Sequence, residues 1–222
     1  MTKKNTKSLV KTFGCRLNLL ESELIEQNIN SSQNKTLVVN TCAVTNEAVK
    51  QAKQFVRKTF RENPGLKIIA TGCAVQTNFK EWSKMPEIFK TIGNTEKLKK
   101  ETWQNLGNNN SLVSDIMIET KANPFFVSGF KERTRAFLQI QQGCDHRCTF
   151  CIIPFGRGNS RSVPITKICK QIKILLEKGF KEIVLTGVDL TSYGNDLYGK
   201  PKLGKLIKEI LKKVKNLERL RL

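Results

Sequence analysis

Residues 143–151 read Gly-Cys-Asp-His-Arg-Cys-Thr-Phe-Cys and place three cysteines, Cys144, Cys148 and Cys151, in one short stretch. Their spacing, C-x3-C-x2-C, allows a single loop to supply three thiolates to one iron–sulfur cluster. A cubane cluster has one iron more than this loop has cysteines, so one iron is left open to bind a substrate. The stretch therefore predicts a cluster with an open coordination position.

The same loop could instead bind zinc through its three thiolates and His146. No second C-x2-C pair follows downstream, and His146 lies two residues from both Cys144 and Cys148, which is awkward for chelating one ion. A disulfide is disfavoured because nothing in the chain suggests export. An iron–sulfur cluster is favoured, and zinc remains the alternative.

The composition indicates a protein of a reducing cytoplasm. The chain has 222 residues, 39% of them hydrophobic, which suffices for one large or two modest domains. Its seven cysteines are too few and too scattered for a secreted disulfide scaffold. No apolar signal core follows the basic residues 1–7, and no run reaches the length of a membrane span. We therefore expect no membrane contact.

The formal net charge of +20 favours a polyanionic partner, of which nucleic acid is the usual kind. The excess is mostly lysine, in a chain that is also rich in Asn and Ile. An AT-rich genome produces such a composition regardless of function. The charge alone thus favours RNA without establishing it.

Apolar strand patterns alternate with helical ones through the first half of the chain. Strands are expected at residues 9–13, 37–40, 67–70 and 88–92. Helices are expected up to about residue 28, with Asn18 and Glu21 as a capping pair, and near residues 46–61, 77–83 and 95–106. This alternation predicts an open parallel α/β sheet as an N-terminal domain, residues 1–118.

Cys15, Cys42 and Cys73 each lie just past the C-terminal end of one of these predicted strands. The carboxyl ends of parallel strands share one edge of the sheet, where ligands bind. Each cysteine alone could be a small buried residue, since free cysteine is among the most buried types. The same placement in three successive units instead favours convergence on one site.

The second half repeats the strand–helix pattern after a linker at residues 119–132. A strand at residues 136–140 leads into the cysteine loop, and strands at 182–187 and 219–222 follow. A helix starting at Pro164 has Cys169 on its apolar face, so Cys169 is predicted to be a core residue and no ligand. A further helix is expected at residues 202–214.

The cysteine loop resembles that of radical S-adenosylmethionine (SAM) enzymes. The residues after it, IIPFGRG at 152–158 and SRS at 160–162, are similar to the methylthiotransferase branch. The segments TFGCRLN at 12–18, NTCAVTNEA at 40–48 and ATGCAVQ at 70–76 resemble the three motifs of the N-terminal domain in that family. The resemblance covers essentially the whole chain, and six cysteines match one for one.

This resemblance implies a fold and a set of cofactors. The N-terminal α/β domain would be followed, at residues 133–222, by the start of a radical SAM (βα)6 partial TIM barrel. Cys144, Cys148 and Cys151 would hold a catalytic 4Fe–4S cluster that binds SAM, with the aromatic Phe150 near its adenine. Gly187 and Asp189, at the mouth of the strand at 182–187, are candidate SAM contacts. Cys15, Cys42 and Cys73 would hold a second 4Fe–4S cluster.

The activity implied is methylthiolation of tRNA at C2 of N6-threonylcarbamoyladenosine next to the anticodon. One cluster, reduced by a donor such as flavodoxin or ferredoxin, would cleave SAM to a 5′-deoxyadenosyl radical. The second would carry the sulfur, and the two would face each other across the base. The basic residues Arg157 and Arg161 are candidates to face the substrate carboxylate. Later barrel strands and an RNA-binding β-domain do not follow, so the chain is expected to be a truncated fragment, inactive alone.

The motif sequences around Cys15 and Cys42 are most similar to those of the threonylcarbamoyladenosine branch. Two sister branches remain as alternatives, one acting on isopentenyladenosine in tRNA and one on an aspartate of a ribosomal protein. Two alternatives belong to other classes of protein: a zinc-bearing RNA-binding module and an iron–sulfur redox sensor.

Overall fold

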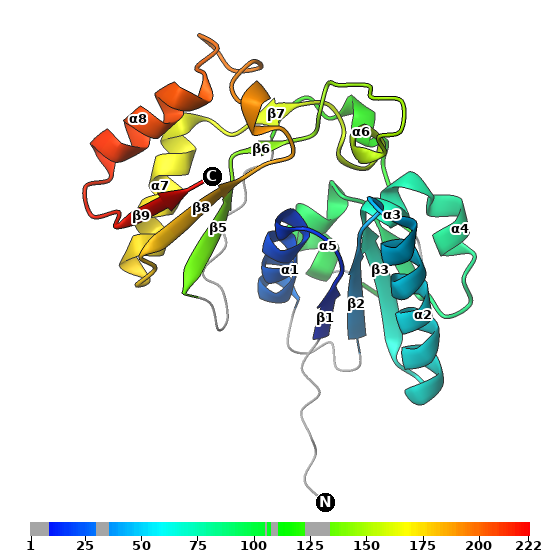
Figure 1. Cartoon of the computed structure of the whole chain (residues 1–222). Coiled ribbons are helices and arrows are strands. Elements are labelled where there is room, and N and C mark those ends of the chain that lie inside the picture. Colours follow the sequence, from blue (N-terminus) through cyan, green and yellow to red (C-terminus); the bar gives the residue numbers. More distant parts are fainter. Residues whose placement is uncertain (1–8, 30–35, 105, 108–110, 123–133) are drawn as a thin grey trace, which may run out of the picture.

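Two parallel sheets lie next to each other and carry the rest of the chain (Figure 1). The computed structural model describes residues 9–29, 36–104, 106–107, 111–122 and 134–222, and the fold is given for these. Most of the predicted linker, residues 119–132, lies outside this set. The two sheets confirm the predicted α/β class with parallel strands.

The first sheet has four strands in the order β1-β2-β3-β4, all parallel. Thr12 pairs with Asn40, and Thr41 pairs with Gly72, so the carboxyl ends of β1, β2 and β3 lie level with one another. The strands are β1 (Leu9–Thr12), β2 (Thr36–Thr41), β3 (Lys67–Gly72) and β4 (Lys90–Ile92).

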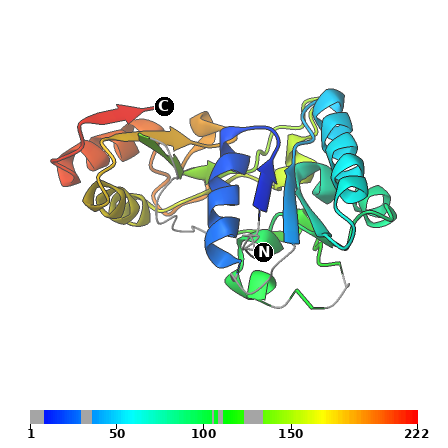
Figure 2. The ribbon, with the colours of Figure 1, turned by 90° about the horizontal axis from the view of Figure 1, so that it is seen from below.

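Helices cover both faces of this sheet (Figure 2). Leu37 and Val39 of β2 pack beneath α2, whereas Val38 packs with α1 and α5, because successive side chains of a strand point to opposite faces. The helices are α1 (Arg16–Asn28), α2 (Asn46–Glu62), α3 (Cys73–Thr77), α4 (Phe79–Ser83) and α5 (Lys100–Gln104), with the 3-10 turns η1 (Glu96–Leu98) and η2 (Ile116–Ile118).

One helix prediction in this half needs correction. The helix predicted at residues 95–106 is divided into η1 and α5 by Lys99, whose backbone is extended. The carbonyl of Lys97 accepts a hydrogen bond from the Trp103 indole at 2.7 Å instead of from the next helical turn. The helix predicted near residues 77–83 is present as α4, which begins at Phe79. The short helix α3 precedes it and is separated from it at Asn78, whose backbone is not helical.

The second sheet has three parallel strands in the order β5-β8-β9, with β8 in the centre. Leu20 and Leu24 of α1 belong to the same apolar core as these strands, so α1 packs against both halves of the chain. The elements are β5 (Arg135–Gln139), β6 (Gln141–Gln142), α6 (Ile153–Arg157), β7 (Arg161–Ser162), α7 (Ile165–Glu177), β8 (Glu182–Thr186), η3 (Leu190–Ser192), α8 (Leu203–Lys213) and β9 (Arg219–Arg221).

The strands and long helices predicted for this half are present, with small differences. Helix α7 begins at Ile165, so Pro164 is its N-cap residue and not its first helical residue. Cys169 is buried in the core, as predicted. The short helix α6 and the antiparallel pair β6–β7 had no counterpart among the predicted elements.

Gly72, the last residue of β3, has a backbone conformation that suits only glycine, with φ at +100°. A Cβ there would lie 2.3 Å from the carbonyl oxygen and 2.4 Å from the nitrogen of Thr41. Gly65 serves as the control, because it also has a positive φ, +84°, but a Cβ there would meet no other atom. Gly65→Ala should therefore cost only the backbone strain, on the order of 1–3 kcal/mol. We expect Gly72→Ala to lower the free energy of unfolding by more than Gly65→Ala, as measured by chemical denaturation. Equal losses would contradict the close approach of the two strands.

Candidate functional site

Cys15, Cys42 and Cys73 converge at the carboxyl edge of the first sheet. Cys42 follows β2 directly and Cys73 follows β3 directly, and the pairing of Thr41 with Gly72 sets them side by side. Cys15 is the N-cap residue of α1. All three line one cavity of about 560 Å³.

Both halves of the chain line this cavity. The first half contributes the three cysteines and the residues beside them, and the second contributes Ile152, Ile153 and Gly156 from the region of α6. The mouth of β8, including Gly187, forms a further part of the wall. The lining is mostly apolar, and of its three cysteines Cys42 is buried, Cys73 is half-buried and Cys15 is exposed.

Glycines allow backbone to approach these sulfur atoms. Gly14 has a φ of +101°, and a Cβ on it would lie 2.8 Å from the Cys42 sulfur. A Cβ on Gly156 would lie 3.2 Å from the Cβ of Cys73. Burial chiefly raises the pKa of the Cys42 thiol, and the neighbouring Cys73 and Cys15 raise it further. Cys73 and Cys15 are therefore close enough to Cys42 to affect its ionisation.

The second cysteine loop is anchored at its base. The Cys144 amide donates to the Gly158 carbonyl at 3.0 Å, and the Asp145 carboxylate accepts from the Ser160 amide at 2.8 Å. Burial raises the pKa of the Cys144 thiol, as do the nearby Asp189, Cys151 and Cys148. Phe150 is 93% exposed, so its ring is free to stack on a ligand.

His146 lies close to Cys144 and Asp189. Its Nε2 lies 3.2 Å from Asp189 Oδ2. Within the described ranges, Cys144, His146 and Asp189 form the only group of three or more ligand atoms lying within 4.8 Å of one another. The sulfurs of Cys148 and Cys151 therefore do not join His146 around a single ion.

Gly187 and Asp189 occupy the mouth of β8. The amides of Val188 and Asp189 both donate to the side-chain oxygen of Gln141, at 2.9 and 2.8 Å. The Asp189 carboxylate accepts from the hydroxyls of Thr191 and Ser192. Burial by itself would raise the pKa of Asp189, but these hydroxyls and His146 outweigh it and lower the pKa. Asp189 is thus held as an anion next to the second cysteine loop.

A buried charge cluster, formed by Glu21, Lys97 and Arg157, was not foreseen from the sequence. Arg157 is the last residue of α6, yet its guanidinium reaches the first half and donates to both oxygens of Glu21. The Glu21 carboxylate also forms an ion pair with Lys97, with a Nζ–Oε2 distance of 2.6 Å. The predicted capping role of Asn18 and Glu21 is wrong, because both are fully buried and Cys15 is the N-cap.

Arg157 and Arg161 do not match the role suggested for them. The Arg157 guanidinium is taken up by Glu21, Asn18 and the Cys73 sulfur. Arg161 is buried as well, donates to the Arg157 carbonyl and lines a separate small cavity with Gln139. The Arg157 guanidinium is therefore not free for a substrate carboxylate, whereas the Nε of Arg161 is buried without a hydrogen-bond partner.

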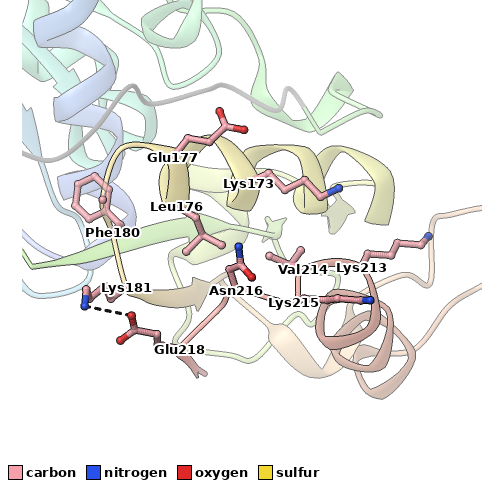
Figure 3. A pocket seen from close by; sticks show the side chains of 11 residues that line it. Lys173, Leu176, Glu177, Phe180, Lys181, Lys213, Val214, Lys215, Asn216 and Glu218 are labelled. Atoms are coloured by element: carbon pink, nitrogen blue, oxygen red, sulfur yellow. Dashed lines mark ion pairs between the residues drawn. The ribbon is translucent and has the colours of Figure 1, made fainter.

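A second large cavity, of about 650 Å³, lies by the turns that follow α7 and α8 (Figure 3). Lys181 and Glu218 form an ion pair of 3.2 Å on its wall, and Lys213 pairs with Glu209. It contains none of the cysteines and none of the other predicted site residues. No helix in the described parts of the chain is long and apolar enough to cross a membrane.

Two family models match the chain, one on each half. Residues 7–94 match "Uncharacterized protein family UPF0004", and residues 138–222 match "Radical SAM superfamily". Each half of the chain is thus similar to a different family model. These matches confirm the predicted resemblance.

Curated relatives match over nearly the whole chain. A protein of Rickettsia prowazekii named "Threonylcarbamoyladenosine tRNA methylthiotransferase MtaB" is 50% identical over 98% of this chain and 52% of its own length. A protein of the same name from Bacillus subtilis is 35% identical, over 95% of this chain and 49% of its own length. "Ribosomal protein uS12 methylthiotransferase RimO" of Carboxydothermus hydrogenoformans is 34% identical over 92% of this chain and 49% of its own length. The chain spans about half the length of the curated relatives it matches.

A solved structure supports the fold. The radical SAM methyltransferase TsrM from Kitasatospora setae, with a SAM analogue bound, is similar with a TM-score of 0.53 at 12% identity. The similarity covers 87% of this chain and 43% of that chain. It confirms the predicted fold class.

Proposed function

We propose that the protein is a radical SAM tRNA methylthiotransferase acting at C2 of N6-threonylcarbamoyladenosine next to the anticodon. The observation that carries this proposal is the convergence of Cys15, Cys42 and Cys73 on a cavity whose opposite wall follows the second cysteine loop. A cysteine triad on each half suits a reaction that needs both a radical source and a sulfur source. The name of the 50% identical relative supports the choice of nucleoside.

The residues present fit two iron–sulfur clusters. Soft thiolate ligands select such clusters. Cys15, Cys42 and Cys73 line one cavity, and Cys144, Cys148 and Cys151 belong to a single loop. Cys144, Cys148 and Cys151 would hold the SAM-binding cluster, and Cys15, Cys42 and Cys73 would hold the second. When bound, the first supplies the electron that cleaves SAM, and the second supplies a site for sulfur.

The side chains around the two sites have separate tasks in this proposal. The exposed Phe150 ring would stack on the adenine of SAM. Gln141 fixes the Val188 and Asp189 amides, and so keeps the backbone at Gly187 in place beside the cavity. Asp189, held by two hydroxyls, would accept a hydrogen bond from a polar group of SAM.

The proposed partners are tRNA and a small reducing protein. The net charge of +20 is expected to give strongly salt-dependent tRNA binding, because each phosphate contact releases counterions. An acidic electron donor, such as a flavodoxin or ferredoxin, would be attracted by the same charge.

Nucleoside mass spectrometry tests the proposal. We expect tRNA from a strain that lacks the full-length parent gene to lose the methylthio group from threonylcarbamoyladenosine, and complementation with that full-length gene to restore it. Loss from isopentenyladenosine, or from a ribosomal-protein aspartate with tRNA unchanged, would assign the protein to a sister branch. Zinc without acid-labile sulfide in anaerobically purified protein would favour an RNA-binding module instead. Iron and sulfide without SAM cleavage would favour a redox sensor.

A further inference from the structure

Arg157 connects the second half of the chain to the cysteine site of the first half. Its Nε lies 3.1 Å from the Cys73 sulfur, which places an N–H donor on a proposed cluster ligand. Its two Nη atoms donate to Glu21 and Asn18. All three guanidinium nitrogens therefore contact residues of the first half. The side chain is only 3% exposed, and the contact is therefore desolvated.

The loop that carries Arg157 is fixed in place. Asn94 of the first half donates to the Gly156 carbonyl and lies 3.7 Å from the Cys73 sulfur. Arg161 donates to the Arg157 carbonyl, and Gly158 turns the chain with a φ of +75°. Arg157 thus reaches Cys73 from a rigid support and not from a mobile surface loop.

The buried charge cluster has more cations than anions. Lys97 and Arg157 both pair with Glu21, and all three side chains are almost fully excluded from water. An uncompensated charge in such a place is costly, so a further anion is expected within reach. The Cys73 sulfur is the atom that lies there, and a thiolate or a thiolate-ligated cluster carries the negative charge required.

We propose that Arg157 is a positioning residue that tunes the cluster on Cys15, Cys42 and Cys73, an inference that rests on the proposed function. Hydrogen bonds to ligand sulfurs and nearby cations favour the more negative, reduced state of a cluster and so raise its reduction potential. Because Arg157 belongs to the second half, correct docking of the two halves sets the potential of the sulfur-carrying site. The site of the first half would then have its working potential only beside the SAM-binding half.

The test is a redox titration of the full chain monitored by electron paramagnetic resonance. A background in which Cys144, Cys148 and Cys151 are alanine leaves only the cluster of interest. In it, we expect Arg157→Gln to shift the reduction potential to a more negative value. Arg157→Lys, which keeps a charge but loses the Nε–H donor to sulfur, should give a smaller negative shift.

Lys97→Gln is the matched control, because it also removes one buried cation and leaves one ion pair with Glu21. Since Lys97 does not donate to a cysteine sulfur in the described structure, its shift should be clearly smaller than that of Arg157→Gln. A purely structural role predicts the opposite sign, because water entering a loosened site would stabilise the reduced state and raise the potential.

The outcomes separate this inference from the function on which it rests. A background variant that binds no iron would refute the proposed second cluster itself. A bound cluster whose potential is unchanged or rises in Arg157→Gln, or shifts equally in Lys97→Gln, would refute the role of Arg157 alone. If Arg157→Gln does not fold, Arg157→Lys decides, and an unchanged potential in that variant would overturn the inference.

Discussion

Replacing Cys144, Cys148 and Cys151 together with alanine is expected to abolish SAM cleavage while leaving about half of the iron bound. The three thiolates lie on one loop, and no other described cysteine lines it. The other triad, on the first sheet, draws its ligands from separate strands and does not depend on this loop. Release of 5′-deoxyadenosine and iron and sulfide content, measured on anaerobically reconstituted protein, check both parts of the expectation.

The reciprocal variant sharpens this test. Alanine at Cys15, Cys42 and Cys73 should also remove about half of the iron, but it should leave SAM cleavage and abolish methylthio transfer. Cys169→Ala is the control, because Cys169 lies in the apolar core of the second half and should leave the iron content unchanged. Loss of all iron in either triple variant would show that the two sites are not independent.

Much of the cysteine arrangement could be predicted because it follows from local patterns. A buried strand such as β2 has an apolar sequence, TLVVNT, and Cys42 comes next in the chain. Parallel strands bring their carboxyl ends to one edge, so the position of each cysteine after its strand already implied a shared site. The cysteine loop at residues 143–151 could also be predicted, because all its proposed ligands are close together in the sequence.

The contacts between the two halves could not be predicted from local patterns. Arg157 and Glu21 are 136 positions apart, and nothing in the sequence around Glu21 distinguishes a buried ion pair from a helix cap. The same applies to Lys97 in η1, which also pairs with Glu21. One feature of the sequence did indicate that Glu21 is buried. Glu21 lies between the apolar residues Leu20 and Leu24 of α1, a helix that packs against both halves of the chain.

Glu21→Gln is expected to destabilise the chain severely, by about 3–5 kcal/mol, since it leaves Lys97 and Arg157 as buried cations without their shared carboxylate. Chemical denaturation of the cluster-free chain would measure the loss. Glu62→Gln is the matched control, because Glu62 forms an exposed i,i+4 pair of 3.8 Å with Lys58 and should have little effect. Similar losses in the two variants would contradict the buried charge cluster.

The pH dependence of this loss provides a second, independent measurement. Burial alone would raise the pKa of Glu21, but the adjacent Arg157 and Lys97 outweigh it and hold the pKa below its ordinary value of 4.5. A carboxylate with a lowered pKa stabilises the fold above its ordinary pKa, and that stabilisation disappears as the pH falls through the lowered value. The stability difference between the natural chain and Glu21→Gln should therefore be constant near neutral pH and shrink on acidification below about 4.5. A difference that stays the same in acid would mean that the variant acts through packing, and that the two cations do not depend on the charge of Glu21.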